Sequence, residues 1–176
     1  MPLISPAGWA FENRIAAPAC WAVFKQLEQP LKAKGRPHLI VPVTASWYEQ
    51  LPECYARIGI SRGPPRGQRG YRMYRPLAPG SWFRAVDAAV FSRLYLAQLA
   101  KLDPAKVLAE LNEMAGGLIP ALLCFEPPPP DPNWCHRASV SAWLGDALGI
   151  KVVEVGHETA GAGWQHPKQL RSTNPG

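Results

Sequence analysis

The sequence predicts a small three-layer α/β domain with a mostly parallel sheet flanked by helices. Three observations support this fold class. Segments of strand length alternate with segments whose apolar residues recur at helical spacing. The segment Ile119–Phe125 is the most apolar one, as is typical of a central strand. The chain has 176 residues and an apolar fraction of 47%, which is sufficient for one packed core.

The first half of the predicted domain contains two strands and several irregular segments. Leu39–Val43 is expected to be a strand, and Pro42 within it indicates an edge position or a bulge. Trp47–Tyr55 is expected to form a short helix or turn. The alternating segment Ala56–Ser61 predicts a second strand, which leads into an arginine- and glycine-rich loop. Tyr71–Pro79 is predicted to be irregular or extended.

The second half predicts three helices and two strands. Asp103 is a favourable N-cap with Pro104 in the first helical position, and the helix they begin should stop at Gly116-Gly117. The expected elements are helix Ala88–Lys101, the helix from Pro104, strand Ile119–Phe125, helix Arg137–Leu148 and strand Ile150–Val155.

The domain is expected to span residues 37–157. Residues 1–36 are interpreted as an N-terminal extension with one helix, at Ala19–Leu31, and residues 158–176 as a flexible tail. No apolar run approaches the roughly 18 residues of a membrane span. The four cysteines are too few and too irregularly spaced for a disulfide scaffold. A cytoplasmic protein with reduced thiols and no membrane contact is therefore predicted.

Positive charge is concentrated in one part of the chain. Between Cys54 and Val86 there are seven arginines and no acidic residue, so this window carries a net charge of +7. Because the net charge of the whole chain is +6, the remaining residues together carry −1. Such a segment favours an anionic partner, namely nucleic acid, nucleotide or phosphate. The alternative is a solvated loop that aids solubility. We predict the following phosphate- or nucleotide-binding residues, with Tyr71 stacking on a base: Arg62, Arg66, Tyr71, Arg72 and Arg137.

A second candidate site lies where the central strand ends and the last helix begins. Glu126 follows the strand, and Cys135, His136 and Arg137 begin the helix. Ligands of α/β sheets bind at the carboxyl ends of strands beside helix N-termini. Cys135 could be a thiolate nucleophile, with His136 as a base and Glu126 as its orienting group or as the acid/base itself. These three are the candidate catalytic residues.

Each of these residues also has a purely structural interpretation. Cys135 could be a small buried side chain and His136 a hydrogen-bonding residue of the loop or cap. Arg137 could capture an anion or form an ion pair with Glu126, and the sequence leaves both open.

Several other kinds of site are disfavoured by spacing. Cys124, Cys135 and His136 match no zinc signature, so the sequence assigns no metal and no cofactor. A cysteine-phosphatase loop would need an arginine six positions after the nucleophile, where the chain has Ser141 or Pro130. The glycine-rich loop after the second strand fits neither a P-loop nor a dinucleotide fingerprint.

Several short motifs in both halves of the domain resemble one protein family. They are Pro42-Val43-Thr44, Arg57-Ile58-Gly59-Ile60-Ser61-Arg62-Gly63, Tyr71-Arg72, Leu77-Ala78-Pro79, Leu102-Asp103-Pro104, Gly116-Gly117, Ala121-Leu122-Leu123-Cys124 with Glu126, Cys135-His136-Arg137 and Trp143-Leu144. Over about residues 38–155 the chain resembles the uncharacterised "domain of unknown function 488" family. The resemblance implies a small three-layer α/β fold and supplies no established reaction. The N-terminal extension, the proline-rich loop before Cys135 and the tail depart from the family pattern.

Three functions therefore follow as hypotheses. The first is a domain that binds a nucleotide or nucleic acid through the arginine-rich loop. The second is a hydrolase or transferase that acts on a nucleoside-like substrate through Glu126 with Cys135 or His136. The third is a protein-interaction module that uses the N-terminal helix and the proline-rich loop.

Overall fold

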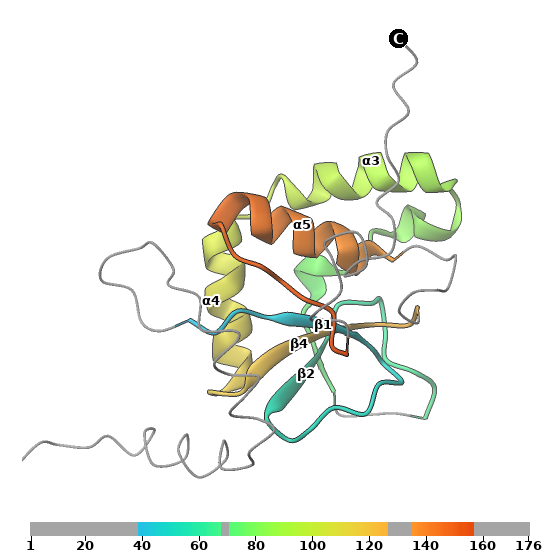
Figure 1. Ribbon diagram of the computed structural model, residues 1–176. Helices are drawn as coiled ribbons and strands as arrows, with labels where there is room; N and C mark the ends of the chain where they lie inside the picture. Colours follow the sequence, from blue (N-terminus) through green and yellow to red (C-terminus); the bar gives the residue numbers. More distant parts are fainter. Residues whose placement is uncertain (1–38, 68–70, 127–134, 157–176) are drawn as a thin grey trace, which may run out of the picture.

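A four-stranded parallel sheet organises the fold (Figure 1). The computed structural model describes residues 39–67, 71–126 and 135–156. The strand order is β1-β4-β2-β3, and every pair is parallel. The predicted α/β class with a parallel sheet is thus confirmed. The strands are β1 (Val43–Ser46), β2 (Tyr55–Gly59), β3 (Arg72–Met73) and β4 (Ile119–Cys124).

Three α-helices begin and end largely where local sequence signals place them. The Asp87 side chain accepts a hydrogen bond at the start of the first helix, and Asp103 accepts two at the start of the second. Gly116 and Gly149 end the second and third helices with φ of +60° and +67°. The helices are α3 (Ala88–Leu99), α4 (Pro104–Ala115) and α5 (His136–Leu148), with short 3-10 helices η1 (Arg75–Leu77) and η2 (Ser81–Arg84).

The two faces of the sheet are covered differently. Leu122 of β4 faces a core to which all three helices contribute, and Figure 1 shows these helices on one side of the sheet. Its neighbours Ala121 and Leu123 face a second-face cluster, because side chains alternate along a strand. No helix of the described residues contributes to this second-face cluster, whose buried members are Val43, Ala45, Trp47, Cys54, Tyr55, Ile119, Ala121, Leu123 and Val153.

The register brings the carboxyl ends of three strands to one edge. Ser46 of β1 lies opposite Cys124, and Gly59 of β2 lies opposite Leu123. The chain continues from this edge as Ser61–Gly63 after β2 and as Phe125–Glu126 after β4. Chemistry-bearing residues from two separate segments therefore meet there.

Two predicted strands differ from the observed ones. The segment predicted as Leu39–Val43 does not pair until Val43, because the Asn112 side chain of α4 bonds both the N–H and the C=O of Ile40. Ile150–Val155 forms only one parallel bridge, between Thr44 and Glu154, where the side chain of Glu154 is committed to an ion pair. Trp47–Tyr55 is a turn segment whose last residue already belongs to β2.

Some predictions fall on residues that the structure does not describe. The expected helix Ala19–Leu31, the proline-rich loop at 127–134 and the tail at 158–176 lie outside the described residues. None of the helices within 39–67, 71–126 and 135–156 has both the length and the apolar character needed to cross a membrane.

Candidate functional site

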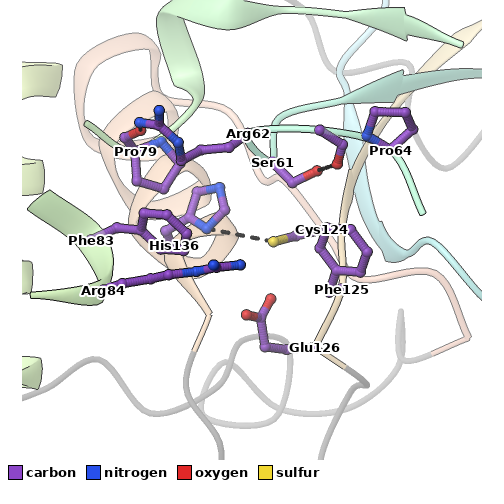
Figure 2. A pocket seen from close by; sticks show the side chains of 11 residues that line it. Ser61, Arg62, Pro64, Pro79, Phe83, Arg84, Cys124, Phe125, Glu126 and His136 are labelled. Atoms are coloured by element: carbon purple, nitrogen blue, oxygen red, sulfur yellow. Dashed lines mark hydrogen bonds between the residues drawn. The ribbon is translucent and has the colours of Figure 1, made fainter. Parts of the chain in front are cut away.

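A cavity of about 280 Å³ lies at the carboxyl edge of the sheet (Figure 2). Four segments line it: Ser61–Pro64 after β2, Pro79 with Phe83 and Arg84 around η2, Cys124–Glu126 at the end of β4, and His136 at the start of α5. The arrangement follows the rule that parallel sheets bind ligands beyond the ends of their strands.

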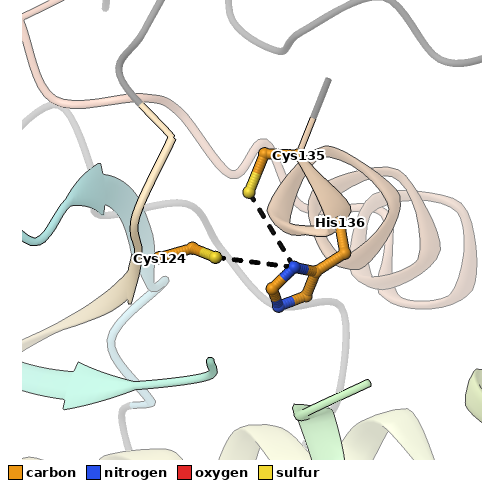
Figure 3. A group of neighbouring side chains, drawn as sticks. All are labelled: Cys124, Cys135 and His136. Atoms are coloured by element: carbon orange, nitrogen blue, oxygen red, sulfur yellow. Dashed lines mark hydrogen bonds between the residues drawn. The ribbon is translucent and has the colours of Figure 1, made fainter. Parts of the chain in front are cut away.

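Two thiols and an imidazole meet at one side of this cavity (Figure 3). Nδ1 of His136 lies 3.6 Å from Sγ of Cys124 and 3.9 Å from Sγ of Cys135. All three side chains are buried, with exposed fractions of 3%, 3% and 5% for Cys124, Cys135 and His136. Of the three, Cys124 and His136 line the cavity, whereas Cys135 does not.

The imidazole of His136 is held from two sides. Its Nε2 lies 3.0 Å from the carbonyl oxygen of Ile60, which can only accept, so Nε2 carries a hydrogen. The ring of Tyr95 meets the imidazole edge-on at 5.3 Å, and the Tyr95 hydroxyl is itself fixed by donating to the carbonyl of Leu77. These contacts direct Nδ1 toward the thiols.

The pKa values of the two thiols are shifted in opposite directions. Burial would raise the pKa of Cys135, but a hydrogen bond with Cys124 and the charges of His136 and Arg137 outweigh it and lower that pKa to about 6. Burial raises the pKa of Cys124 well above its ordinary value, and the neighbouring Cys135 and Glu126 raise it further. Of the two thiols, Cys135 is therefore the one that loses its proton more readily.

The pKa values of His136 and Glu126 respond to the same charges. Burial would lower the pKa of His136, but the attraction of Cys135 outweighs this and raises it. Burial would raise the pKa of Glu126, yet hydrogen bonds from Cys124 and Cys135 lower it. The Oε2 atom of Glu126 is shielded from solvent and makes no hydrogen bond of good geometry within the described residues.

Arg137 is not placed to bind an anionic ligand, contrary to the prediction. Its side chain is fully buried and forms a bidentate pair with Glu154, at 2.9 Å between Nη2 and Oε1 and 3.1 Å between Nε and Oε2. Nη1 donates to the backbone carbonyl of Glu126 at 2.6 Å and to Sγ of Cys135 at 3.5 Å. An ion pair was one of the two open interpretations, but the partner carboxylate is Glu154, not Glu126.

The other predicted phosphate-binding residues do not share one site. Arg62 lines the cavity, whereas the exposed Arg66 and Arg72 do not. The Tyr71 ring packs against Trp47 of the second-face cluster, with ring centroids 5.2 Å apart, so it does not stack in the cavity.

Sequence reasoning missed three site residues. Arg84 and Phe83 line the cavity from η2, and both belong to the Ser81–Arg84 segment, which combines an arginine with two aromatics. Glu154 interrupts an otherwise apolar run, and a carboxylate in such a run signals a buried partner. Cys124, which the sequence suggests only as a possible metal ligand, lines the cavity together with Glu126 and His136.

Comparison with known proteins yields no family assignment for the chain. No family description, no curated protein and no solved structure matches it. The resemblance to the "domain of unknown function 488" family thus stays a prediction made from the residues. The function has to be argued from the chemistry of the cavity itself.

Proposed function

We propose that this protein binds a small nucleotide-like molecule in the cavity at the carboxyl edge of the sheet. The observation that carries the proposal is the convergence of Arg62 and Arg84, from two different segments, on one cavity. Both guanidinium groups also lie over the ring of Phe83, at 5.6 and 5.1 Å from its centroid. Guanidinium groups held in this way suit a phosphate group.

The polar groups of the cavity favour a nucleotide over a bare phosphate. The Glu126 carboxylate lines the same cavity and lies at the opposite end of the view from Arg62 in Figure 2. A carboxylate repels a simple anion but accepts hydrogen bonds from a sugar hydroxyl or a base N–H. The ligand therefore needs both negative charge and hydrogen-bond donors.

The size and position of the cavity favour a mononucleotide over a nucleic acid strand. Its volume of about 280 Å³ lies just below the usual range of small-molecule pockets, roughly 300–1,000 Å³. A strand would need a continuous basic track, but the exposed Arg66 and Arg72 lie outside the cavity. A single phosphorylated nucleoside is the ligand that we propose.

Replacing either cavity arginine is expected to weaken nucleotide binding by about 10- to 100-fold. A charge-assisted hydrogen bond contributes about 1.5–3 kcal/mol, and about 1.4 kcal/mol corresponds to a factor of ten. The measurement is the Kd of fluorescent nucleoside monophosphates, compared between the wild type, Arg62→Ala and Arg84→Ala. The matched controls Arg66→Ala and Arg72→Ala remove arginines outside the cavity and should leave Kd within about twofold.

Three further ligands make this result decisive. The unphosphorylated nucleoside and inorganic phosphate should each bind more weakly than the nucleotide. Single-stranded DNA in a salt series tests the polymer alternative, because strand binding through phosphates falls steeply with salt. Tight DNA binding that depends on Arg66 and Arg72, or equal nucleotide affinity in wild type and both cavity variants, would refute the proposal.

The acid/base groups that line the cavity favour a second candidate function, which is hydrolysis or group transfer on the bound molecule. Cys124, Glu126 and His136 line the same cavity as the two arginines, so acid/base groups would lie beside the ligand. Under this hypothesis, Glu126→Gln should abolish conversion of a nucleotide while changing its Kd by less than about fivefold. Product formation is followed by chromatography. Turnover that survives Glu126→Gln would exclude a role for this carboxylate in catalysis.

A further inference from the structure

We propose that Cys124, Cys135 and His136 bind a zinc ion at the floor of the cavity. The ligand atoms are the two Sγ atoms and Nδ1, which all lie within 4.8 Å of one another. The three residues come from the end of β4 and the start of α5, so the tertiary structure assembles a site that the linear spacing conceals. The inference concerns the metal alone and does not depend on nucleotide binding.

The separations fit tetrahedral coordination. Zn–S bonds of about 2.3 Å and Zn–N bonds of about 2.0–2.1 Å place sulfur and nitrogen ligands about 3.6 Å apart at the tetrahedral angle. The observed Sγ–Nδ1 distances are 3.6 Å for Cys124 and 3.9 Å for Cys135. A zinc ion therefore requires only small movements of side chains that are already in place.

The hydrogen bonds around His136 prepare its nitrogen for a metal. Nε2 donates to the carbonyl of Ile60, so in the neutral imidazole the lone pair lies on Nδ1, which faces both thiols. Metal-binding histidines characteristically donate their second ring N–H to a carbonyl or carboxylate, which fixes the tautomer and the ring orientation. The Ile60 carbonyl has that position here.

The charges of the buried site also balance. Binding leaves both thiols deprotonated and His136 neutral, with the displaced protons released to solvent, and the two thiolates offset the charge of Zn²⁺. Nη1 of Arg137 lies 3.5 Å from Sγ of Cys135, where it can donate to a thiolate. The charge of Arg137 is already matched by Glu154, so no buried charge is left uncompensated.

A water molecule or a group of a ligand in the cavity would complete the tetrahedral shell, because zinc sites with three protein ligands keep an open fourth position. The Glu126 carboxylate is not part of the cluster of ligand atoms that lie within 4.8 Å of one another, but it lines the same cavity. Cys124, Glu126 and His136 all line the cavity, so the ion would be reached from the cavity side.

The test is a titration of the reduced, metal-free 176-residue chain with Co²⁺, a spectroscopic substitute for zinc. Cys20→Ser is used as the background for every variant, because Cys20 lies outside the described residues. We expect one Co²⁺ per chain, with thiolate-to-cobalt charge-transfer absorption and tetrahedral ligand-field bands. Added Zn²⁺ should abolish both signals, since zinc binds such sites more tightly.

Variants identify the ligands. Cys124→Ser and Cys135→Ser should each lower the charge-transfer intensity or weaken Co²⁺ binding at least tenfold. His136→Gln, which retains both thiols, should weaken Co²⁺ binding at least tenfold. The matched control is Cys54→Ser, because Cys54 is also buried but belongs to the second-face cluster. It should retain the full spectrum.

A second measurement on the unmodified chain covers variants that fail to fold. X-ray absorption of the zinc-loaded wild type should show two sulfur ligands at about 2.3 Å and two nitrogen or oxygen ligands at about 2.0 Å. A reduced chain that gives no thiolate charge transfer would overturn the proposal. So would a zinc shell without two sulfurs, or a spectrum lost in Cys54→Ser and kept in Cys124→Ser. The proposal would also be overturned if a Cys124–Cys135 disulfide formed in air and then persisted when Zn²⁺ was added in the presence of a reductant.

Discussion

Replacing Arg137 with methionine is expected to lower the free energy of unfolding by about 3–5 kcal/mol. The guanidinium is fully buried and pairs with Glu154, which is only 1% exposed, so the variant leaves a buried carboxylate without its charge partner. The Thr44 hydroxyl still donates to Glu154 at 2.6 Å, but a hydroxyl does not offset a full charge. Urea denaturation followed by circular dichroism measures the loss.

Two controls separate the buried charge from the lost side chain. Lys106→Met removes a partner of the exposed Lys106–Glu110 pair, whose lysine side chain is 73% exposed, and should cost less than about 1 kcal/mol. The double variant Arg137→Met/Glu154→Leu removes both charges and should regain part of the stability. A loss below about 1 kcal/mol in Arg137→Met would contradict a tightly paired buried arginine.

Leu122→Ala is expected to destabilise the protein by about 2–5 kcal/mol. Leu122 is completely buried in the middle of the central strand and faces the helix-side core, so truncation leaves a cavity between β4 and the helices. The same denaturation measurement applies. Leu96→Ala is the matched control, because Leu96 is 51% exposed, and its effect should stay within about 0.5 kcal/mol. Equal effects in the two variants would show that Leu122 is not part of a packed core.

The helices and the central strand were predictable because their signals are local. Asp103 followed by Pro104 predicts the start of α4, and Gly116 predicts its end through a positive φ that glycine adopts easily. The continuous apolar run of β4 predicts burial on both faces, and all of its residues are buried. The segments at the edge of the sheet were harder to predict. The Asn112 side chain bonds the backbone of Ile40, and no local sequence pattern predicts that contact.

The location of the candidate site followed from a topological rule, but its composition did not. A strand end at Cys124–Glu126 and a helix start at Cys135–His136 predict proximity in a parallel α/β sheet. Arg84 could not be assigned, because it reaches the cavity from a segment separated from β4 by two helices. The position of Tyr71 could not be predicted, because it depends on a tertiary contact with Trp47 of the second-face cluster.

The amino-acid sequence by itself determined the α/β class, the helix termini and the part of the chain that carries thiol and imidazole groups. These properties depend on periodicity and on caps, which act over a few residues. Only the tertiary structure decided that Arg137 pairs with Glu154 and that Arg62 and Arg84 share a cavity. It also decided that two thiols and an imidazole lie within 4.8 Å of one another. Such contacts depend on how strands and helices pack across long sequence separations, where the partner of a side chain is chosen by burial and not by its neighbours in the chain.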